Sequence, residues 1–219
     1  MRIAIVGGHG KIARLLHPLL VGAGHQPVAL VRRDSYRERL EALGAEVRLL
    51  DIENDDEQVF AETFARCGAV VFAAGGGPDG NIERKRTVDL EGSLKSIAAA
   101  RAAGIARFVQ VSAINVDQPV PEDAEPVWRA YVEAKRDADV ALRESGLDWT
   151  ILRPGLLTDS PGTGLVSLGE AVPRGEVPRA DVAAVLAAVL AEPGTAGRQW
   201  DLVGGSTPIK EAIDAALGG

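Results

Sequence analysis

Short aliphatic runs recur along the chain, and they alternate with stretches in which apolar residues repeat at every third or fourth position. Within each run the apolar residues are consecutive or interrupted by a single polar residue, which is typical of strands that a sheet buries on both faces. The runs lie at residues 3–6, 27–31, 47–50, 69–73, 108–111 and 149–152. The pattern therefore predicts six buried strands.

The stretches between the runs predict helices. Apolar residues from 12 to 20 share one helical face, and Gly22 ends that pattern. Similar periodicity predicts helices at 35–43, 82–103, 127–145, 180–190 and 209–217, with one more strand at 200–203. Strict alternation of strands and helices predicts an α/β fold, in which a doubly wound parallel sheet carries helices on both faces.

The chain length and the texture of its last third bear on domain organisation. A length of 219 residues suits one well-buried core. Residues 156–178 are rich in proline and glycine, which predicts loops. We expect a single domain over residues 1–219, with residues 156–219 as a small C-terminal segment of that domain.

A glycine turn separates the first predicted strand from the first predicted helix. Gly7, Gly10 and Ala13 have G-x-x-G-x-x-A spacing, which permits a tight turn and lets a pyrophosphate approach the helix N-terminus. The alternative is an ordinary glycine-rich loop, but the strand–turn–helix context favours a Rossmann-type dinucleotide site. The residues predicted to bind the cofactor here are Gly7, Gly8, His9, Gly10, Lys11 and Ile12. For His9 and Lys11, a solvent-facing position is equally compatible with the sequence.

The residues after the second predicted strand bear on the identity of the cofactor. In a Rossmann-type domain an acid at this place binds the ribose 2′-hydroxyl of NAD, whereas an arginine pairs with the 2′-phosphate of NADP. Arg32 and Arg33 therefore favour NADP over NAD. Asp34 follows them and is either the ribose acid of an NAD site or the N-cap of the next helix.

Two further strand ends are candidates for cofactor contacts. Asp51 and Ile52 follow the third strand, where the adenine lies in this architecture, although a helix-capping or solvated acid is an equal alternative for Asp51. Ala74, Gly75 and Gly76 follow the fourth strand and would run along the phosphates and ribose of the cofactor. Glycines at strand ends also occur in plain turns.

Tyr131 and Lys135 are four residues apart on a predicted helix and so share one face. A tyrosine beside a lysine can work as a proton donor with a pKa-lowering cation. A Y-x-x-x-K match alone is a weak signal. Here it precedes a strand that ends in Arg153-Pro154-Gly155, which strengthens it.

Taken together, the glycine turn, the Tyr131-x-x-x-Lys135 pair and the Leu152-Arg153-Pro154-Gly155 turn resemble the atypical short-chain dehydrogenase/reductases, in particular the NAD(P)H-binding group of epimerase/dehydratase-like proteins. The resemblance covers essentially the whole chain. It implies that Tyr131 is the general acid/base, that Lys135 holds the nicotinamide ribose and lowers the tyrosine pKa, and that Pro154 and Gly155 lie beside the nicotinamide. It also implies an oxidoreductase or epimerase/dehydratase that acts on a small carbonyl or alcohol, with residues 156–219 on the substrate side.

The chain departs from the family pattern after the fifth strand. The catalytic Ser/Thr of the family usually stands one or two residues beyond the first serine, where this chain has Ala113 and Ile114. Ser112 is then the candidate third catalytic residue. The alternative hypothesis is a protein that binds NADP(H) without catalysis, as a redox sensor or an interaction protein.

Composition and charge exclude several classes of protein and partner. Apolar residues make up 46% and charged residues 25% of the chain, which is ordinary for a globular protein. A formal net charge of −7 and scattered basic residues argue against a nucleic-acid partner. No apolar run is long enough for a membrane span or a leader, the single Cys67 forms no disulfide framework, and no residues have metal-ligand spacing. We expect a cytoplasmic monomer or homodimer that binds a small-molecule substrate.

Overall fold

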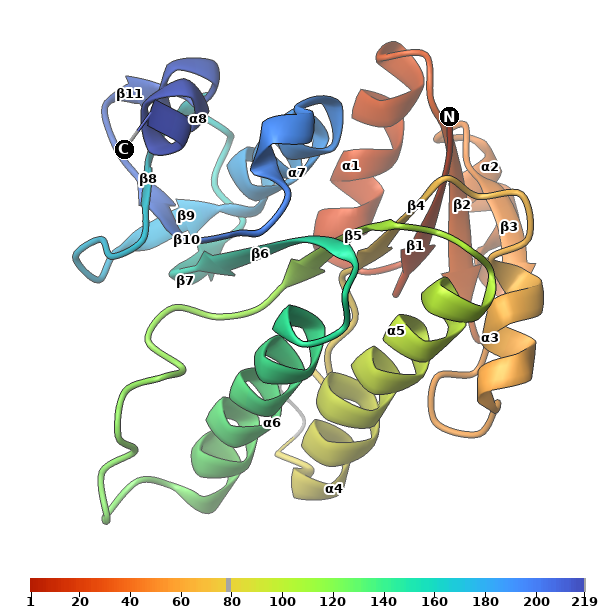
Figure 1. Ribbon diagram of the computed structural model, residues 1–219, viewed down its shortest axis with the longest axis horizontal. Helices are drawn as coiled ribbons and strands as arrows, with labels where there is room; N and C mark the ends of the chain where they lie inside the picture. The colour runs from red at the N-terminus through yellow and green to blue at the C-terminus, as the bar shows by residue number, and fades with distance from the viewer. Residues whose placement is uncertain (78–79, 219) are drawn as a thin grey trace.

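A large, mostly parallel sheet forms the centre of the computed structural model, which describes residues 1–77 and 80–218 (Figure 1). Within those residues the sheet has nine strands in the order β11-β8-β10-β6-β5-β4-β1-β2-β3. They are β1 (Arg2–Val6), β2 (Gln26–Val31), β3 (Glu46–Leu49), β4 (Ala69–Phe72), β5 (Arg107–Val111), β6 (Asp148–Pro154), β8 (Leu165–Gly169), β10 (Arg198–Gly204) and β11 (Thr207–Pro208). A separate parallel pair joins β7 (Leu156–Thr158) to β9 (Glu176–Pro178).

The helical elements fill the connections between the strands. The α-helices are α1 (Lys11–Gly22), α2 (Arg37–Glu41), α3 (Glu57–Thr63), α4 (Ile82–Arg84), α5 (Gly92–Ala102), α6 (Pro126–Arg143), α7 (Arg179–Ala191) and α8 (Ile209–Gly218). The 3₁₀ turns are η1 (Asp34–Tyr36) and η3 (Pro193–Thr195), and the segment η2 (Lys85–Glu91) is a π-helix. In the described part of the chain, no helix combines the length and apolar character needed to cross a membrane.

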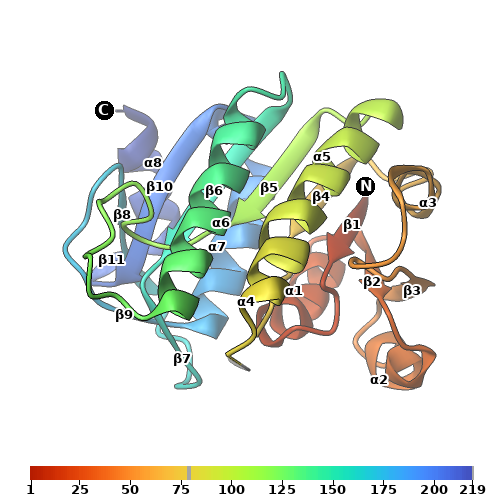
Figure 2. The ribbon, with the colours of Figure 1, turned by 90° about the horizontal axis from the view of Figure 1, so that it is seen from below.

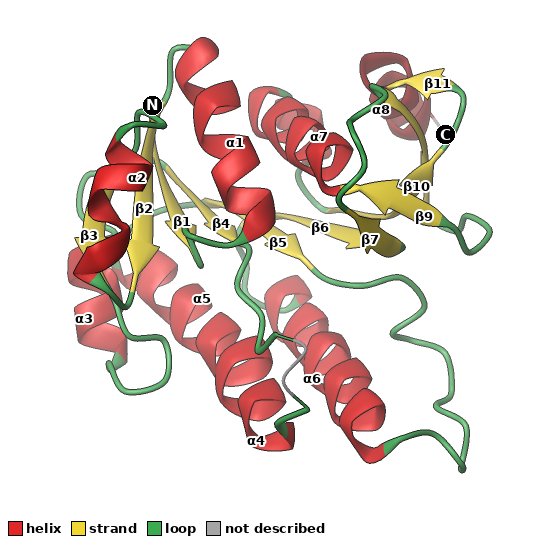
Figure 3. Cartoon of the chain, turned by 180° about the vertical axis from the view of Figure 1, so that it is seen from behind, coloured by secondary structure: helices red, strands yellow, loops and turns green. Residues whose placement is uncertain are grey.

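Helices cover both faces of the sheet. Alternate residues of β1 point to opposite sides, so that Ile5 belongs to the apolar cluster that includes residues of α1, α7 and α8, and Val6 belongs to the cluster that includes residues of α3, α5 and α6. Figure 3 shows these two helical layers, and Figure 2 shows α5 and α6 side by side across one of them. The expected doubly wound, Rossmann-type architecture is confirmed.

The strand order places a topological switch point at β1. The chain proceeds from β1 to β2 and β3 on one side, then crosses back so that β4 lies on the other side of β1. The connections that leave the carboxyl ends of β1 and β4 therefore go to opposite faces. In open α/β sheets this arrangement leaves a crevice in which ligands bind.

Two expectations from the sequence need correction. The helix expected over 82–103 is three consecutive segments, α4, η2 and α5, because the register widens to a π-helix over Lys85–Glu91. The region 156–178, expected to be loops, contains the short strands β7, β8 and β9. In addition, β8 runs antiparallel to both of its neighbours, β10 and β11, so the sheet is not wholly parallel.

Candidate functional site

A cleft of about 270 Å³ opens at the switch point, at the carboxyl ends of β1, β2, β3 and β4. We call it the switch-point cleft. Its lining residues come from the glycine turn, from the ends of these strands and from the segment that follows β4. They are Gly7, His9, Gly10, Leu30, Val31, Arg32, Tyr36, Leu50, Asp51, Ile52, Glu53, Ala73, Ala74, Gly75, Arg84 and Val88.

The glycine turn leaves no room for side chains beneath the cleft. Gly7 has φ +79°, and a Cβ atom there would lie 2.7 Å from the Cα of Ala74. A Cβ atom on Gly8 would lie 2.7 Å from the Cα of Ala29. Gly10 is the N-cap of α1, and neither a side-chain cap nor an acidic residue in the first turn occupies that helix end. The first N–H groups of α1 are thus available to an anion, which fits the diphosphate of a dinucleotide.

One wall of the switch-point cleft is aromatic. The rings of His9 and Tyr36 are stacked, with centroids 3.7 Å apart and planes at 5°. Burial, together with the cations of Arg14 and Arg39, lowers the pKa of His9. The side chain of His9 therefore lines the cleft as a neutral, stacked ring.

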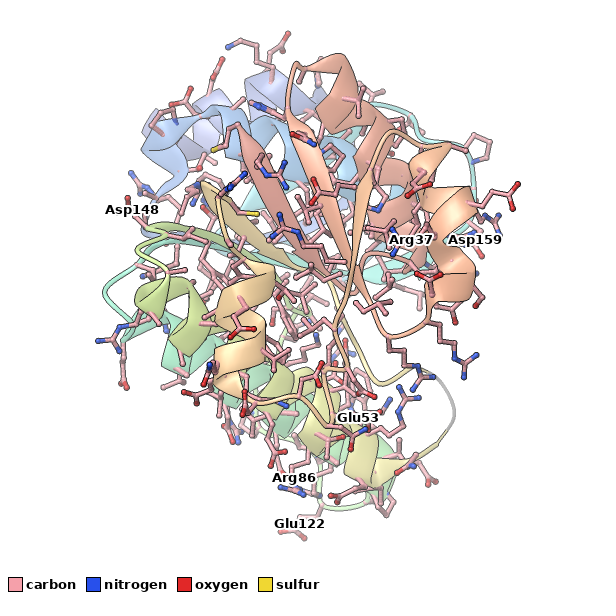
Figure 4. All side chains as sticks on the ribbon, turned by 90° about the vertical axis from the view of Figure 1, so that its right-hand side faces the viewer. Arg37, Glu53, Arg86, Glu122, Asp148 and Asp159 are labelled. Atoms are coloured by element: carbon pink, nitrogen blue, oxygen red, sulfur yellow. The ribbon has the colours of Figure 1, made fainter. Side chains whose placement is uncertain are left out.

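Glu53 lies between two arginines in the same cleft. Its carboxylate is 3.8 Å from the guanidinium of Arg32 and 3.6 Å from Nε of Arg84, and it accepts a hydrogen bond of 2.9 Å from Thr87. Figure 4 shows the place of Glu53 among the side chains. The cleft thus contains two cations and one carboxylate where the ribose of a dinucleotide would lie.

Two other residues predicted to bind the cofactor have different surroundings. Arg33 and Lys11 are not among the described residues that line the cleft. Lys11 pairs with Asp159 at 2.5 Å, and Asp159 also pairs with Arg179 at 2.7 Å. These contacts link the start of α1 to the segment after β7.

Asp51 and Ile52 line the cleft, but the Asp51 carboxylate caps its own turn. It accepts hydrogen bonds from the amides of Glu53 and Asn54 and from the Asn54 side chain. The Asn54 side-chain bond is the main cause of the lowered pKa of Asp51. Ile12, also predicted to bind the cofactor, lies on α1 in the apolar core between that helix and the sheet.

Tyr131 and Lys135 lie on α6, and the Lys135 side chain reaches the loop that follows β4. Lys135 is 5% exposed, and its ammonium donates to the carbonyl oxygens of Val111, at 3.2 Å, and Ala74, at 3.5 Å. It also pairs with the Asp89 carboxylate at 3.1 Å. Since Ala74 lines the switch-point cleft, the α6 lysine and the cleft are in contact through one residue.

The charges around Tyr131 oppose one another. Burial raises the pKa of Tyr131, the Lys135 cation lowers it, and the carboxylates of Asp89 and Asp139 raise it, with a net upward shift. Burial disfavours the charged form of Lys135, but Asp89 and Tyr131 outweigh burial and the pKa of Lys135 is raised. The lysine therefore acts on the tyrosine in the expected direction, yet the phenol stays protonated at neutral pH.

Ser112 belongs to a buried polar network. Its hydroxyl donates to Asp139 at 2.8 Å, and Gln110 donates to the other oxygen of Asp139 at 2.7 Å. Arg153 donates to Asp139 at 2.9 Å and pairs with Asp117 at 2.6 Å. The Ser112 proton is thus directed at a carboxylate one helical turn beyond Lys135.

Pro154 and Gly155 are held at the carboxyl end of β6 by backbone contacts. The Pro154 carbonyl accepts from the amide of Ile114 at 3.0 Å, and the Gly155 amide donates to the carbonyl of Leu202 at 2.9 Å. A Cβ atom on Gly155 would collide with the carbonyl of Gly175. This contact requires glycine at position 155.

Several residues of the site were not singled out from the sequence. They are Tyr36, Glu53, Arg84, Asp89 and Asp139. Asp139 had a usable signal, because it follows Lys135 by four residues and so shares its helix face. The acids and arginines on the other elements carry no such spacing. Across residues 1–77 and 80–218, no group of three or more His, Cys, Asp or Glu residues is arranged to hold a metal ion.

A doubly wound sheet with a glycine turn and an open helix N-terminus at its switch point defines a dinucleotide-binding protein. Comparison with known families specifies this class. A family model described as NAD(P)H-binding matches residues 7–193. The chain therefore belongs to the NAD(P)H-binding family, and the resemblance drawn from its motifs is confirmed.

Relatives cover nearly the whole chain. YhfK of Bacillus subtilis, an uncharacterized sugar epimerase by name, is 39% identical over 214 residues, which span 97% of this chain and 99% of the relative. A Bacillus halodurans structure, provisionally named an NAD-dependent epimerase/dehydratase, is 37% identical with a TM-score of 0.90 and covers 98% of this chain and 99% of its own. The oxidoreductase ylbE of Lactococcus lactis is 26% identical with a TM-score of 0.87, over 100% of this chain and 98% of its own.

Proposed function

We propose that this protein is an NADP(H)-dependent oxidoreductase or epimerase that acts on a small carbonyl or alcohol substrate. The observation that carries the proposal is the contact between Lys135 and the Ala74 carbonyl, which joins the Tyr131 helix to the switch-point cleft. The names of the relatives, an epimerase and an oxidoreductase, agree with this class of reaction.

Each part of the proposal has a residue in a defined role. The nicotinamide ring, when bound, supplies or accepts a hydride at C4. Tyr131, held protonated by its buried surroundings, donates a proton to the carbonyl oxygen of the substrate. Lys135 provides a buried cation beside the phenol and the ribose. Pro154, Gly155 and residues 156–219 form the substrate side.

We infer a preference for NADP over NAD from the cations in the switch-point cleft. Arg32 and Arg84 both line the cleft, and a 2′-phosphate pairs favourably with guanidinium groups. Arg33, which also suggested NADP, is not one of the lining residues in the described part of the chain. Titration of the purified protein with NADPH and NADH tests the preference, and equal affinity for the two cofactors would contradict it.

Replacement of Tyr131 tests the catalytic role. We expect Tyr131→Phe to lose at least about 100-fold in turnover, because the proton donor is removed, while NADPH affinity stays near that of the wild type. The measurement is steady-state reduction of a panel of small aldehydes and ketones, with NADPH binding measured on the same samples. Retained turnover in Tyr131→Phe would remove this tyrosine from the mechanism.

Ser112 favours a second candidate function. Its hydroxyl is engaged by Asp139, and Ala113 stands where the family usually has a hydroxyl residue. A protein that binds NADP(H) without turnover, as a redox sensor, fits this arrangement. Tight NADPH binding with no turnover on any member of the panel would favour the sensor.

Cytoplasmic residence and a monomeric or homodimeric state stay predictions. Sedimentation equilibrium measures the oligomeric state.

A further inference from the structure

The π-helical segment η2 carries two buried charged side chains into the candidate site. Lys85 is 5% exposed, donates to the Gly77 carbonyl and lies 5.9 Å from the ring centroid of Tyr131. Asp89 is 1% exposed and pairs with Lys135 at 3.1 Å. π-Helical turns are rare and often mark functional sites, and charged residues are almost never fully buried unless they are paired. Both features of η2 thus point to a role in the candidate site.

Within residues 1–77 and 80–218, Asp89 is the one carboxylate in direct contact with the Lys135 ammonium. The ammonium has three N–H donors, and its other acceptors are the carbonyl oxygens of Val111 and Ala74. A buried ammonium is stabilised by a carboxylate that both pairs with it and accepts its hydrogen bond. Asp89 thus holds the Lys135 ammonium in place.

The same carboxylate also holds the glycine loop after β4. Its second oxygen accepts a hydrogen bond of 2.8 Å from the amide of Gly76. A Cβ atom on Gly76 would lie 3.1 Å from that oxygen and 2.7 Å from the carbonyl oxygen of Arg84. One buried side chain thereby connects the α6 lysine to the backbone beside the switch-point cleft.

We propose that Asp89 is a positioning residue, whose carboxylate fixes Lys135 and the backbone at Gly76 in the arrangement that Tyr131 and a nicotinamide ribose require. The ribose part rests on the proposed function. The placement of Asp89, Lys135 and Tyr131 does not, and it is testable in the protein alone.

The charges that face Tyr131 determine the direction in which its titration shifts when Asp89 is replaced. Asp89 and Lys85 approach from η2, and Lys135 and Asp139 from α6, while Arg153 of β6 pairs with Asp139. Removal of the Asp89 charge leaves the cations in excess. The tyrosinate form is then favoured, and the Tyr131 titration moves to lower pH.

Tyrosinate absorbance measures this directly, because the chain has two tyrosines and Tyr36→Phe leaves Tyr131 alone. In that background we expect Asp89→Asn to lower the titration midpoint by roughly one pH unit. The control is Asp148→Asn, which removes the same charge from an exposed residue at the start of β6. Figure 4 shows Asp148 on a different part of the molecule from Glu53 and the switch-point cleft. A midpoint that Asp89→Asn leaves unmoved would overturn the proposal.

Ligand binding provides a second readout at neutral pH. We expect Asp89→Asn to weaken NADPH binding roughly tenfold, through loss of charge-assisted contacts, and to leave 2′,5′-ADP binding unchanged, because that probe lacks the nicotinamide riboside. Equal weakening of both ligands would mean that Asp89 serves only the fold. If the wild type binds 2′,5′-ADP and NADPH equally weakly or not at all, the proposed function fails, while the tyrosine titration still decides the role of Asp89.

Asp89→Glu covers the case in which Asp89→Asn does not fold. It keeps the charge and displaces the carboxylate by one methylene group. We expect the Tyr131 midpoint to stay near that of the parent protein, with weakened NADPH binding and unchanged 2′,5′-ADP binding. Binding of NADPH by Asp89→Glu at the wild-type level would overturn the positioning role.

Discussion

Glu53 places a negative charge among the cations expected to bind the cofactor. The side chains of Arg32, Glu53 and Arg84 are 45%, 27% and 29% exposed, and the ion pairs measure 3.8 and 3.6 Å. Pairs of this kind are individually weak. An incoming 2′-phosphate would therefore compete with Glu53 for both guanidinium groups and would also be repelled by it.

We expect Glu53→Gln to strengthen NADPH binding roughly threefold and to leave NADH binding unchanged, because only NADPH carries the phosphate that competes with the carboxylate. Isothermal titration calorimetry with both cofactors measures the effect. Glu122→Gln, an exposed residue outside the lining set, is the control for net charge. If both cofactors bind more weakly to Glu53→Gln, Glu53 contacts the adenosine itself.

The residues of the site differ in how visible they are in the sequence. Tyr131 and Lys135 were found because they share one turn of a regular α-helix. Asp89 was not, since the π-helix changes which residues of 82–103 share a face, and α-helical spacing is then a poor guide. Glu53 and Arg84 meet through tertiary structure alone, and no local pattern predicts that contact.

At the scale of elements, the turn between β1 and α1 combines two requirements for glycine. Gly7 needs a positive φ, and its Cα faces the backbone of Ala74 without space for a methyl group. We expect Gly7→Ala to destabilise the fold by about 2 kcal/mol and to weaken NADPH binding, because the turn must shift away from the diphosphate. Urea unfolding and NADPH titration check the two effects.

Gly24 is the matched control for that substitution. It follows α1, has φ +76°, and a Cβ atom there would meet open space. Gly24→Ala should therefore show only the backbone effect, about 1 kcal/mol, with normal NADPH binding. Equal loss of NADPH affinity in both variants would contradict a specific role of the glycine turn in cofactor binding.

The sequence predicted some elements better than others for a physical reason. The strands β1, β2, β4, β5 and β6 are buried on both faces, so their aliphatic runs were visible. Within 156–178, β7 and β9 pair with each other, and β8 pairs with β10 and β11, which lie further along the chain. Proline and glycine dominate their local sequence, and only the distant pairing makes them strands.

At the scale of the whole molecule, one sheet includes strands from β1 to β11, so we propose that the described chain unfolds as one cooperative unit. NADPH at a hundred times its Kd should stabilise that unit by about 2.7 kcal/mol, which raises Tm by roughly 5–10 °C in a chain of this length. Differential scanning calorimetry with and without NADPH measures both. Two transitions, of which NADPH moves only one, would contradict the single-domain prediction.

The position of β8 has a consequence for biosynthesis. This strand lies between β10 and β11, and both of its partners follow it in the chain. A nascent chain that has emerged only as far as residue 190 therefore has β8 without a sheet partner and β6 at an open edge. Unpaired edges recruit other chains, so ribosome stalling or truncation before β10 is expected to give aggregates rather than a smaller folded protein.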